Sequence, residues 1–257
     1  MRRYVEGRWG QVHLRDDGEG PALLMLHQSP LSGAMFDAAL PFLRGFRVLR
    51  PDTPGFGMSD PPPEPQSIAA HADALAALMD ALELERAHVL GHHTGAMIAA
   101  RLAAAHPARV ERLVLNGVPW LTAAERAHFA AFEFKPVEPR PDGGHLLDAW
   151  NQRLRASPGW TDLRAMHAHV VTMLTVGERY HWGFAMALGH DMEPDLRAVS
   201  APTLVLSNTG DDLRDATRRA AALRPDWAWA ELSEGTHDIV DEQPEAWAAA
   251  VAGFLNS

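Results

Sequence analysis

The stretch Val89–Ala105, VLGHHTGAMIAARLAAA, carries the strongest fold signal in the chain. It opens with an apolar run that suits a buried strand, turns within the five residues from Gly91 to Gly95, and continues as an alanine-rich sequence typical of a helix. Glycines at both ends of the turn leave room for a strained backbone at the residue between them. The pattern predicts a strand, a tight turn and a helix whose small side chains let it approach the strand closely.

Short apolar runs repeat on both sides of this stretch. Each is bounded by glycine or proline, as expected for strands buried on both faces of a parallel sheet. The runs are Ala22–His27, Val48–Pro51, Ala87–Gly91, Val110–Asn116 and Pro202–Ser207. We expect helices between them, because the intervening segments carry apolar residues at helical spacing. The alternation predicts an α/β fold.

Further segments show where individual helices and an edge hairpin lie. Ser67 is placed to cap a helix that runs to Leu82, and the proline that opens Pro244–Leu255 marks the start of a last helix. Alternating polar and apolar residues over Arg2–Glu6 and Gln11–Arg15 predict an antiparallel hairpin. We therefore expect a mostly parallel sheet with one antiparallel edge.

The alternation breaks over about residues 119–195. This segment contains proline clusters, several helical patterns and large apolar side chains, among them Phe134, Trp150 and Trp182. An insertion of this size after the sixth strand predicts a helical lid above the strand ends, within a single domain that spans 1–257. Its aromatic residues either line a pocket for a small apolar or aromatic substrate or form the small core of the lid itself.

The composition excludes several classes of protein. The chain has 257 residues, 47% of them hydrophobic, a formal net charge of −10 and no cysteine. One domain is expected at this length, and thiolate nucleophiles, zinc–thiolate sites and iron–sulfur clusters are excluded. The acidic balance disfavours nucleic acid as a partner. No apolar run reaches the roughly 18 residues of a membrane span, so we expect no membrane partner and a cytoplasmic protein that acts on a small molecule.

The turn GHHTG (residues 91–95) resembles the nucleophile elbow, G-x-S-x-G, of the α/β-hydrolase superfamily, in the same strand, turn and helix context. His93 stands where that family carries its serine. Two earlier loops also match the family in order. HQSP (residues 27–30) resembles its H-G-x-P loop, and PDTPGFGMSD (residues 51–60) resembles its D-x-x-G-x-G-x-S-D loop.

The same resemblance extends to the C-terminal part of the chain. NTGDDL (residues 208–213) follows a buried run, as the family's acid-bearing turn does, and GTHD (residues 235–238) resembles the loop of the catalytic histidine. The resemblance implies catalytic roles for His93, Asp212 and His237, with Asp211 as the alternative acid.

The resemblance also implies an oxyanion hole and a fold. His27, Gln28 and Thr94 are the implied oxyanion and substrate-binding residues, and the backbone N–H groups of Gln28 and Thr94 are the implied donors. The implied fold is the α/β-hydrolase fold, a mostly parallel eight-stranded sheet with helices on both faces and a helical lid inserted after strand 6. It requires no cofactor.

A histidine at the elbow allows three interpretations. In the first, His93 is a nucleophile that forms an acyl-imidazole, which water then cleaves. In the second, His93 is a general acid, base or electrostatic clamp while His237 and Asp212 activate water or abstract a proton; two neighbouring imidazoles should then have pKa values pushed apart. In the third, the site is not catalytic and binds a ligand.

A metal site is also conceivable, because His27, His92, His93, His237 and Asp212 lie in loops that could converge. We expect none, since the adjacent histidines of a tight turn point in different directions and no helical H-x-x-x-H pair is present. His92 is predicted to pack or to line the pocket.

The sequence thus predicts a cofactor-independent hydrolase of an ester, lactone or similarly activated acyl bond. The alternatives are a cofactor-free lyase or C–C bond-cleaving enzyme that uses His93 and His237 as acid and base, and a non-catalytic receptor for a small ligand.

Overall fold

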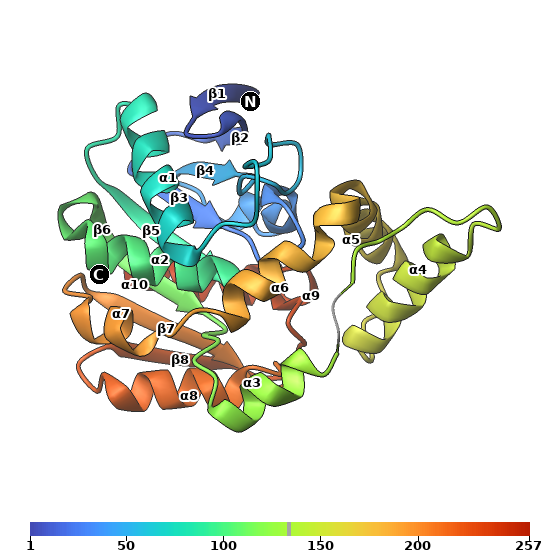
Figure 1. Ribbon diagram of the computed structural model, residues 1–257. Coiled ribbons are helices and arrows are strands. Elements are labelled where there is room, and N and C mark those ends of the chain that lie inside the picture. Colours follow the sequence, from blue (N-terminus) through green and yellow to red (C-terminus); the bar gives the residue numbers. More distant parts are fainter. Residues whose placement is uncertain (133–134) are drawn as a thin grey trace.

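The computed structural model describes residues 1–132 and 135–257, in which eight strands form one twisted sheet (Figure 1). The strands are β1 (Arg2–Gly7), β2 (Gly10–Asp17), β3 (Ala22–Leu26), β4 (Arg47–Pro51), β5 (Ala87–His92), β6 (Val110–Asn116), β7 (Thr203–Asn208) and β8 (Ala228–Leu232). Their order across the sheet is β1-β2-β4-β3-β5-β6-β7-β8. The pairs β1–β2 and β2–β4 are antiparallel and the rest are parallel, which confirms the predicted mostly parallel sheet and its hairpin edge.

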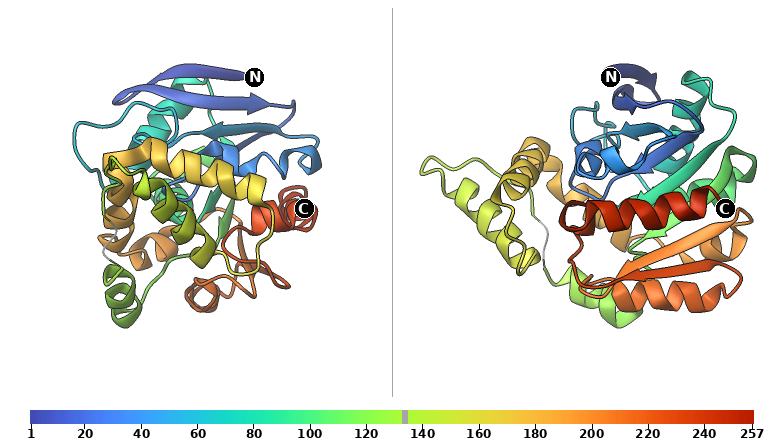
Figure 2. Two further views of the ribbon diagram at one scale, coloured as in Figure 1. Left: turned by 90° about the vertical axis from the view of Figure 1, so that its right-hand side faces the viewer. Right: turned by 180° about the vertical axis from the view of Figure 1, so that it is seen from behind.

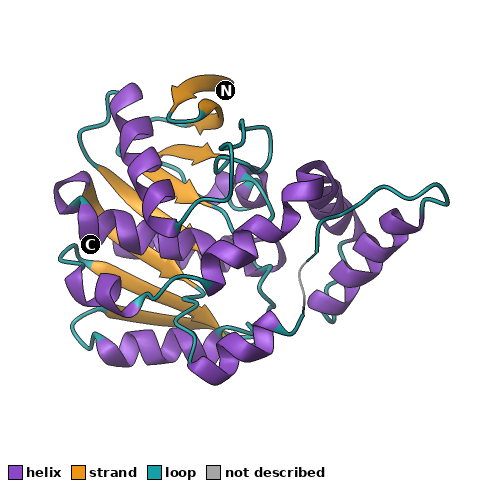
Figure 3. Ribbon diagram, viewed as in Figure 1, coloured by secondary structure: helices purple, strands orange, loops and turns teal. Residues whose placement is uncertain are grey.

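Helices cover both faces of the sheet (Figure 3). The α-helices are α1 (Ile68–Ala81), α2 (Thr94–Ala105), α3 (Ala123–Ala130), α4 (Gly144–Ala156), α5 (Leu163–Val176), α6 (Tyr180–Leu188), α7 (Glu193–Ala198), α8 (Arg214–Leu223), α9 (Ile239–Glu242) and α10 (Pro244–Leu255). Short 3-10 helices span Gly33–Phe36, Leu40–Phe42, Pro107–Arg109 and Gly177–Arg179. None of the helices in residues 1–132 and 135–257 has the length and apolar character needed to cross a bilayer.

Two apolar cores lie on opposite faces of the sheet. On one face, α1, α2 and α8 pack against alternate side chains of the strands. On the other face, α10 places the fully buried Trp247 against Phe36 of the first 3-10 helix, with ring centroids 6.0 Å apart. Figure 2 shows α10 running across the side of the sheet opposite α1 and α2. Burial on both faces explains why the parallel strands are continuous apolar runs.

The predicted helix boundaries hold at several points. Ser67 caps α1, where its Oγ accepts a hydrogen bond from the Ala70 amide at 3.2 Å. The last helix begins at Pro244, as predicted. The elbow helix α2 approaches the sheet so closely that a Cβ on Gly95 would lie 2.1 Å from the carbonyl oxygen of Leu26. Glycine at this position is therefore a packing requirement.

Helices α3 to α7 lie between β6 and β7. The segment predicted as a lid, residues 119–195, ends within α7, and we call it the insertion. Helices α4 and α5 extend away from the sheet, whereas α6 runs back over the body of the molecule (Figures 1 and 2). The contact of α6 with the body is close, since a Cβ on Gly183 would lie 2.4 Å from Ser29 Oγ. Phe134, one of the aromatic residues expected in the lid, lies outside the described residues.

Candidate active site

The turn between β5 and α2 has the geometry of an elbow. His93 has φ 50° and ψ −113°, a region that residues with a side chain rarely adopt. The turn is held by the neighbouring strand, because the His93 amide donates to the Asn116 carbonyl at 2.9 Å. A Cβ on Gly91 would lie 2.2 Å from the Gly95 carbonyl oxygen, so the turn closes only with glycine at position 91. The predicted strained turn is therefore present, with His93 at its apex.

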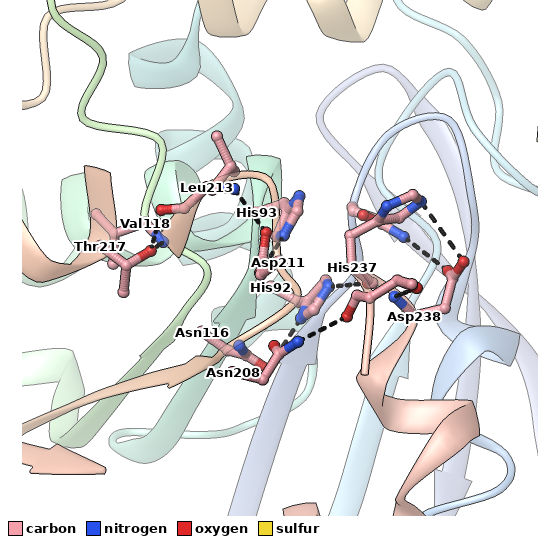
Figure 4. A network of polar contacts seen from close by, with 12 residues as sticks. His92, His93, Asn116, Val118, Asn208, Asp211, Leu213, Thr217, His237 and Asp238 are labelled. Atoms are coloured by element: carbon pink, nitrogen blue, oxygen red, sulfur yellow. Dashed lines mark hydrogen bonds and ion pairs between the residues drawn. The ribbon is translucent and has the colours of Figure 1, made fainter. Parts of the chain in front are cut away.

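The His93 ring faces the acidic turn after β7 (Figure 4). Its Nε2 lies 3.0 Å from Oδ2 of Asp211, whose carboxylate is fully buried. The other Asp211 oxygen accepts a hydrogen bond from the Leu213 amide at 2.8 Å, which fixes the carboxylate. Gly117 lies directly against the ring, and a Cβ there would be 2.3 Å from His93 Cδ2. The absence of a side chain at Gly117 therefore leaves the space that the His93 ring and Asp211 Oδ2 occupy.

These contacts set the charge of the elbow histidine. Burial alone would lower the pKa of His93, but the negative charge and hydrogen bond of Asp211 outweigh burial and raise it. Burial likewise opposes ionisation of Asp211, and the attraction of His93 more than offsets it and lowers the pKa of Asp211. Burial of its carboxyl and the adjacent Asp211 charge raise the pKa of Asp212 to about 6. The cluster favours an imidazolium at His93 held by an ionised Asp211.

The second predicted catalytic histidine has different partners. Nε2 of His237 lies 2.8 Å from Nη1 of Arg153, a residue of α4 in the insertion. Its ring centroid is 6.1 Å from that of His93. Burial lowers the pKa of His237 to about 4, with Arg153 and His93 acting in the same direction and Asp238 opposing them. His237 is therefore neutral at pH 7.

The carboxylate of Asp238, the residue after His237, contacts polar side chains from both the insertion and the body of the molecule. It forms an ion pair with Arg153 and accepts a hydrogen bond from Ser157 Oγ at 2.5 Å, both from the insertion. Nδ1 of His169 lies 3.6 Å from it, and Gln28 Nε2 lies 3.5 Å from it on the side of the body. With its side chain fully buried, Asp238 ties α4 and α5 to the loop that carries His237.

The arrangement differs from the predicted Asp212–His237 pair. The acidic turn pairs with His93, and Asp211, the alternative acid, makes the contact. Within residues 1–132 and 135–257, no ion pair joins His237 to Asp211 or Asp212. The physical reason is the length of the His93 side chain, whose imidazole reaches from the elbow to the acidic turn and takes Asp211 as its own partner.

Sequence reasoning missed Arg153 and Asp238. Asp238 was within the quoted GTHD loop, and its position next to a catalytic histidine was the only available signal. Arg153 belongs to a helix with no motif, and no pattern in the insertion indicates where its side chains point. Its contact with His237 spans 84 positions of the chain.

The oxyanion loop is held by His27. Nε2 of His27 accepts from the Thr53 amide at 2.9 Å, so its Nδ1 carries the proton and donates to the Gln28 carbonyl at 2.9 Å. In the described residues, the backbone N–H groups of Gln28 and Thr94 make no hydrogen bond. Both amides are therefore available to a ligand, as the predicted oxyanion hole requires.

The predicted metal-capable set is not assembled as a whole. Both ring nitrogens of His27 face hydrogen-bond partners, and so do both nitrogens of His92, at Asn116 Oδ1 and the His237 carbonyl. His92 stacks on His93 with centroids 4.5 Å apart, and burial lowers its pKa to about 4. As predicted, it packs beside the site.

Three potential metal ligands do lie together among the described residues. Donor atoms of His93, Asp211 and Asp212 are all within 4.8 Å of one another. The imidazolium of His93 balances the ionised Asp211, and burial raises the pKa of Asp212 to about 6, so we interpret the group as an ion-paired cluster.

Comparison with known proteins agrees with the fold. The model of the family described as alpha/beta hydrolase fold matches residues 21–165. The chain belongs to the α/β-hydrolase fold family. This confirms the predicted fold and the prediction of an enzyme of the hydrolase class.

Several relatives of this α/β-hydrolase fold protein carry specific names. It is 28% identical to the putative carbamate hydrolase RutD of Caulobacter sp. (strain K31), over 98% of this chain and 97% of that protein. It is 35% identical to the 2-hydroxy-6-oxo-6-phenylhexa-2,4-dienoate hydrolase of Comamonas testosteroni, but that match covers 60% of this chain and 51% of the relative. Among solved structures, the enol-lactonase from Burkholderia xenovorans LB400 superimposes with a TM-score of 0.83 at 24% identity, over 99% of this chain and 100% of that one.

Proposed function

We propose that this protein hydrolyses an ester, a lactone or a similarly activated acyl bond of a small, apolar or aromatic substrate, without a cofactor. The observation that carries the proposal is the pair of histidine rings with centroids 6.1 Å apart and opposite protonation preferences. An imidazolium and a neutral imidazole on two sides of one site are the acid and base that hydrolysis requires.

The charge of His93 argues against a nucleophilic role. A nucleophilic imidazole needs a free lone pair, and the ion pair with Asp211 favours the form that has none. His93 at the elbow therefore acts in the proposed reaction as a general acid and not as a covalent nucleophile. The neutral His237 provides the lone pair.

The proposed reaction balances with these two rings. His237 Nε2 accepts a proton from water while the water oxygen bonds to the acyl carbon. The carbonyl oxygen becomes an oxyanion, and the bond from the acyl carbon to the leaving oxygen then breaks. His93 donates its Nδ1 proton, the one that Asp211 does not hold, to the leaving oxygen. Proton exchange with solvent returns His237 to neutral and His93 to imidazolium.

The oxyanion would be stabilised by the free backbone N–H groups of Gln28 and Thr94. Donors positioned in advance for a developing negative charge typically contribute about 3–4 kcal/mol each to lowering the barrier. The hydrogen bonds of His27 fix the backbone that presents the Gln28 amide. The insertion acts as a lid in this proposal, because Arg153, Ser157 and His169 bring α4 and α5 to the same site.

The first experiment exposes the protein to activated aryl esters and lactones, quenches in acid and measures intact mass beside turnover. We expect turnover without a covalent adduct, and a loss of about 10²–10⁴-fold in kcat for both His93→Gln and His237→Gln. An acyl adduct mapped to His93 would contradict the general-acid role. Tight binding without turnover would favour a ligand receptor.

Cleavage of a C–C bond is a second candidate. The name of the Comamonas testosteroni relative, a hydrolase of a 2-hydroxy-6-oxo-dienoate, favours it, and the same acid could protonate a carbon leaving group. Adding 2-hydroxy-6-oxo-6-phenylhexa-2,4-dienoate to the panel separates the two candidates. Preference for this compound over every ester and lactone would select C–C cleavage.

A further inference from the structure

Arg153 is a buried cation that the insertion delivers to the candidate active site. Its side chain is only 7% exposed, and its guanidinium lies 5.8 Å from the centroid of the Trp160 ring. Nη1 contacts His237 Nε2 at 2.8 Å, and Nη2 contacts His169 Nδ1 at 2.9 Å. The ion pair with Asp238 holds the guanidinium in this position.

These contacts determine where the protons lie on two histidines. A guanidinium only donates hydrogen bonds, so each imidazole nitrogen that faces it must accept. Asp238 Oδ2 lies 3.5 Å from Nε2 of His237, farther than the guanidinium at 2.8 Å, so this nitrogen accepts from Arg153 and the proton lies on Nδ1. His169 carries its proton on Nε2, which agrees with Asp241 Oδ2 at 3.0 Å from that nitrogen. Arg153 thus fixes the tautomer of His237, a task that the acidic turn does not perform for this ring.

The contact between Arg153 and His237 also blocks the nitrogen that the proposed reaction uses. Nε2 is the nitrogen that would accept a proton from water, and Arg153 occupies its lone pair. While α4 is docked through Asp238, His237 cannot act as a base. The base becomes free only when the guanidinium leaves Nε2, either because α4 moves or because an acceptor group of the substrate takes the Arg153 N–H.

We propose that Arg153 is a positioning residue that sets the tautomer of His237 and masks its Nε2 lone pair until the substrate or a movement of α4 displaces the guanidinium. This proposal rests on the proposed function, because the masked group is the base of that reaction. It makes proton transfer dependent on the insertion, so an unoccupied site is held inactive.

The surroundings of His237 allow a specific test. The charged and titratable groups that face it are Asp238 beside it, Arg153 from α4, and His93 and Asp211 across the site. His169 lies behind Arg153 and Asp238, and His92 contacts the His237 carbonyl. Removal of Arg153 and the Asp238 charge together leaves no unpaired buried ion. Arg155 on the same helix is exposed and serves as the matched control.

The experiment measures the ¹⁵N signals of the His237 ring by NMR in the full-length protein, with the assignment made by comparison with His237→Gln. In Arg153→Met/Asp238→Asn we expect loss of the single Nδ1–H tautomer. In Arg153→Met alone, which keeps the Asp238 charge, we expect a raised ring pKa. Arg155→Met should match the wild type, and Arg153→Lys should restore most of the wild-type signal. An unchanged tautomer in the double variant, together with an unchanged pKa in Arg153→Met, would overturn the proposal.

Kinetics give an independent readout on any substrate that is turned over. In Arg153→Met we expect the acidic limb of the kcat/KM profile to move to higher pH, as the ring pKa does, and KM to increase. A lower kcat with an unmoved limb would assign Arg153 to packing alone and contradict the proposal. The NMR arm needs no turnover, so a failure of the proposed function and a failure of this proposal give different results.

Discussion

The two halves of the site contain the same side chain in opposite states. At the elbow, His93 faces the ionised Asp211 and its pKa is raised. In the loop before α9, His237 faces the guanidinium of Arg153 and its pKa is lowered to about 4. Both rings are mostly buried, so burial does not distinguish them. The pKa values differ because the Asp211 charge outweighs burial at His93, whereas burial prevails at His237, where Arg153 opposes the effect of Asp238.

The largest effect is expected from breaking the elbow pair. Asp211→Asn removes the charge that keeps His93 protonated, and we expect kcat to fall about 10²–10⁴-fold, the usual contribution of a general acid. Asp212→Asn is the matched control, because Asp212 makes no direct hydrogen bond to His93 among the described contacts. Steady-state kinetics on the best ester or lactone checks this. A larger loss in Asp212→Asn than in Asp211→Asn would show that Asp212, the acid favoured by the sequence, is the functional one.

The next largest effect is on the pH dependence of the free energy of unfolding, to which His93 and His237 contribute with opposite signs. Between pH 6.5 and about 4 the unfolded chain binds a proton that folded His237 does not, so this ring destabilises the fold as the pH falls, by up to about 3 kcal/mol. His93 has the opposite sign. Its raised pKa gives stabilisation that is complete below pH 6.5 and is lost as the pH rises through the folded-state value.

Urea unfolding from pH 4 to pH 8 measures both contributions. His237→Gln should flatten the acidic decline, and His93→Gln should lower stability at pH 5–6. His71, which lies outside the site and whose pKa burial lowers to about 4, provides a control, since His71→Gln should also flatten the decline. A flatter decline in His93→Gln would show that the two rings do not differ.

A smaller effect, confined to the position of His237, is expected from Asn208. Nδ2 of Asn208 donates to the carbonyls of Glu234, Gly235 and Thr236, the three residues before His237. Asn208→Ala leaves these carbonyls without their donor, and we expect about 1–3 kcal/mol lower stability and a misplaced His237. Thermal unfolding and the ¹⁵N spectrum check this. The His93 signal should not move, and an equal shift of both rings would mean that they are coupled through the backbone.

The smallest expected effect is that of salt. The His93–Asp211 pair is buried, whereas Arg140–Asp148 on the insertion is 47% and 69% exposed. Raising the salt concentration to about 1 M should therefore leave the pKa of His93 nearly unchanged, because buried pairs are screened little. NMR titration at two salt concentrations measures it. A large change would assign the raised pKa to the net charge of −10 and not to Asp211.

The body of the molecule was predictable because its signals are local. Strand burial, the glycines of the elbow and the Ser67 cap each depend on residues a few positions apart. The choice between Asp211 and Asp212 was not predictable, since neighbours on a tight turn point in different directions and the Leu213 amide decides which carboxylate turns inward. Arg153 was beyond the sequence for another reason. The helix that carries it reaches the site through tertiary packing, and the spacing of residues along the chain does not indicate such packing.

Gly117 gives the site a signature that can be sought in other genomes. It has φ +63°, and any side chain there would collide with the His93 ring and with Asp211 Oδ2. An elbow histidine oriented in this way therefore requires glycine directly after Asn116 at the end of β6. We therefore expect members of the family with histidine at the elbow to carry glycine at this position.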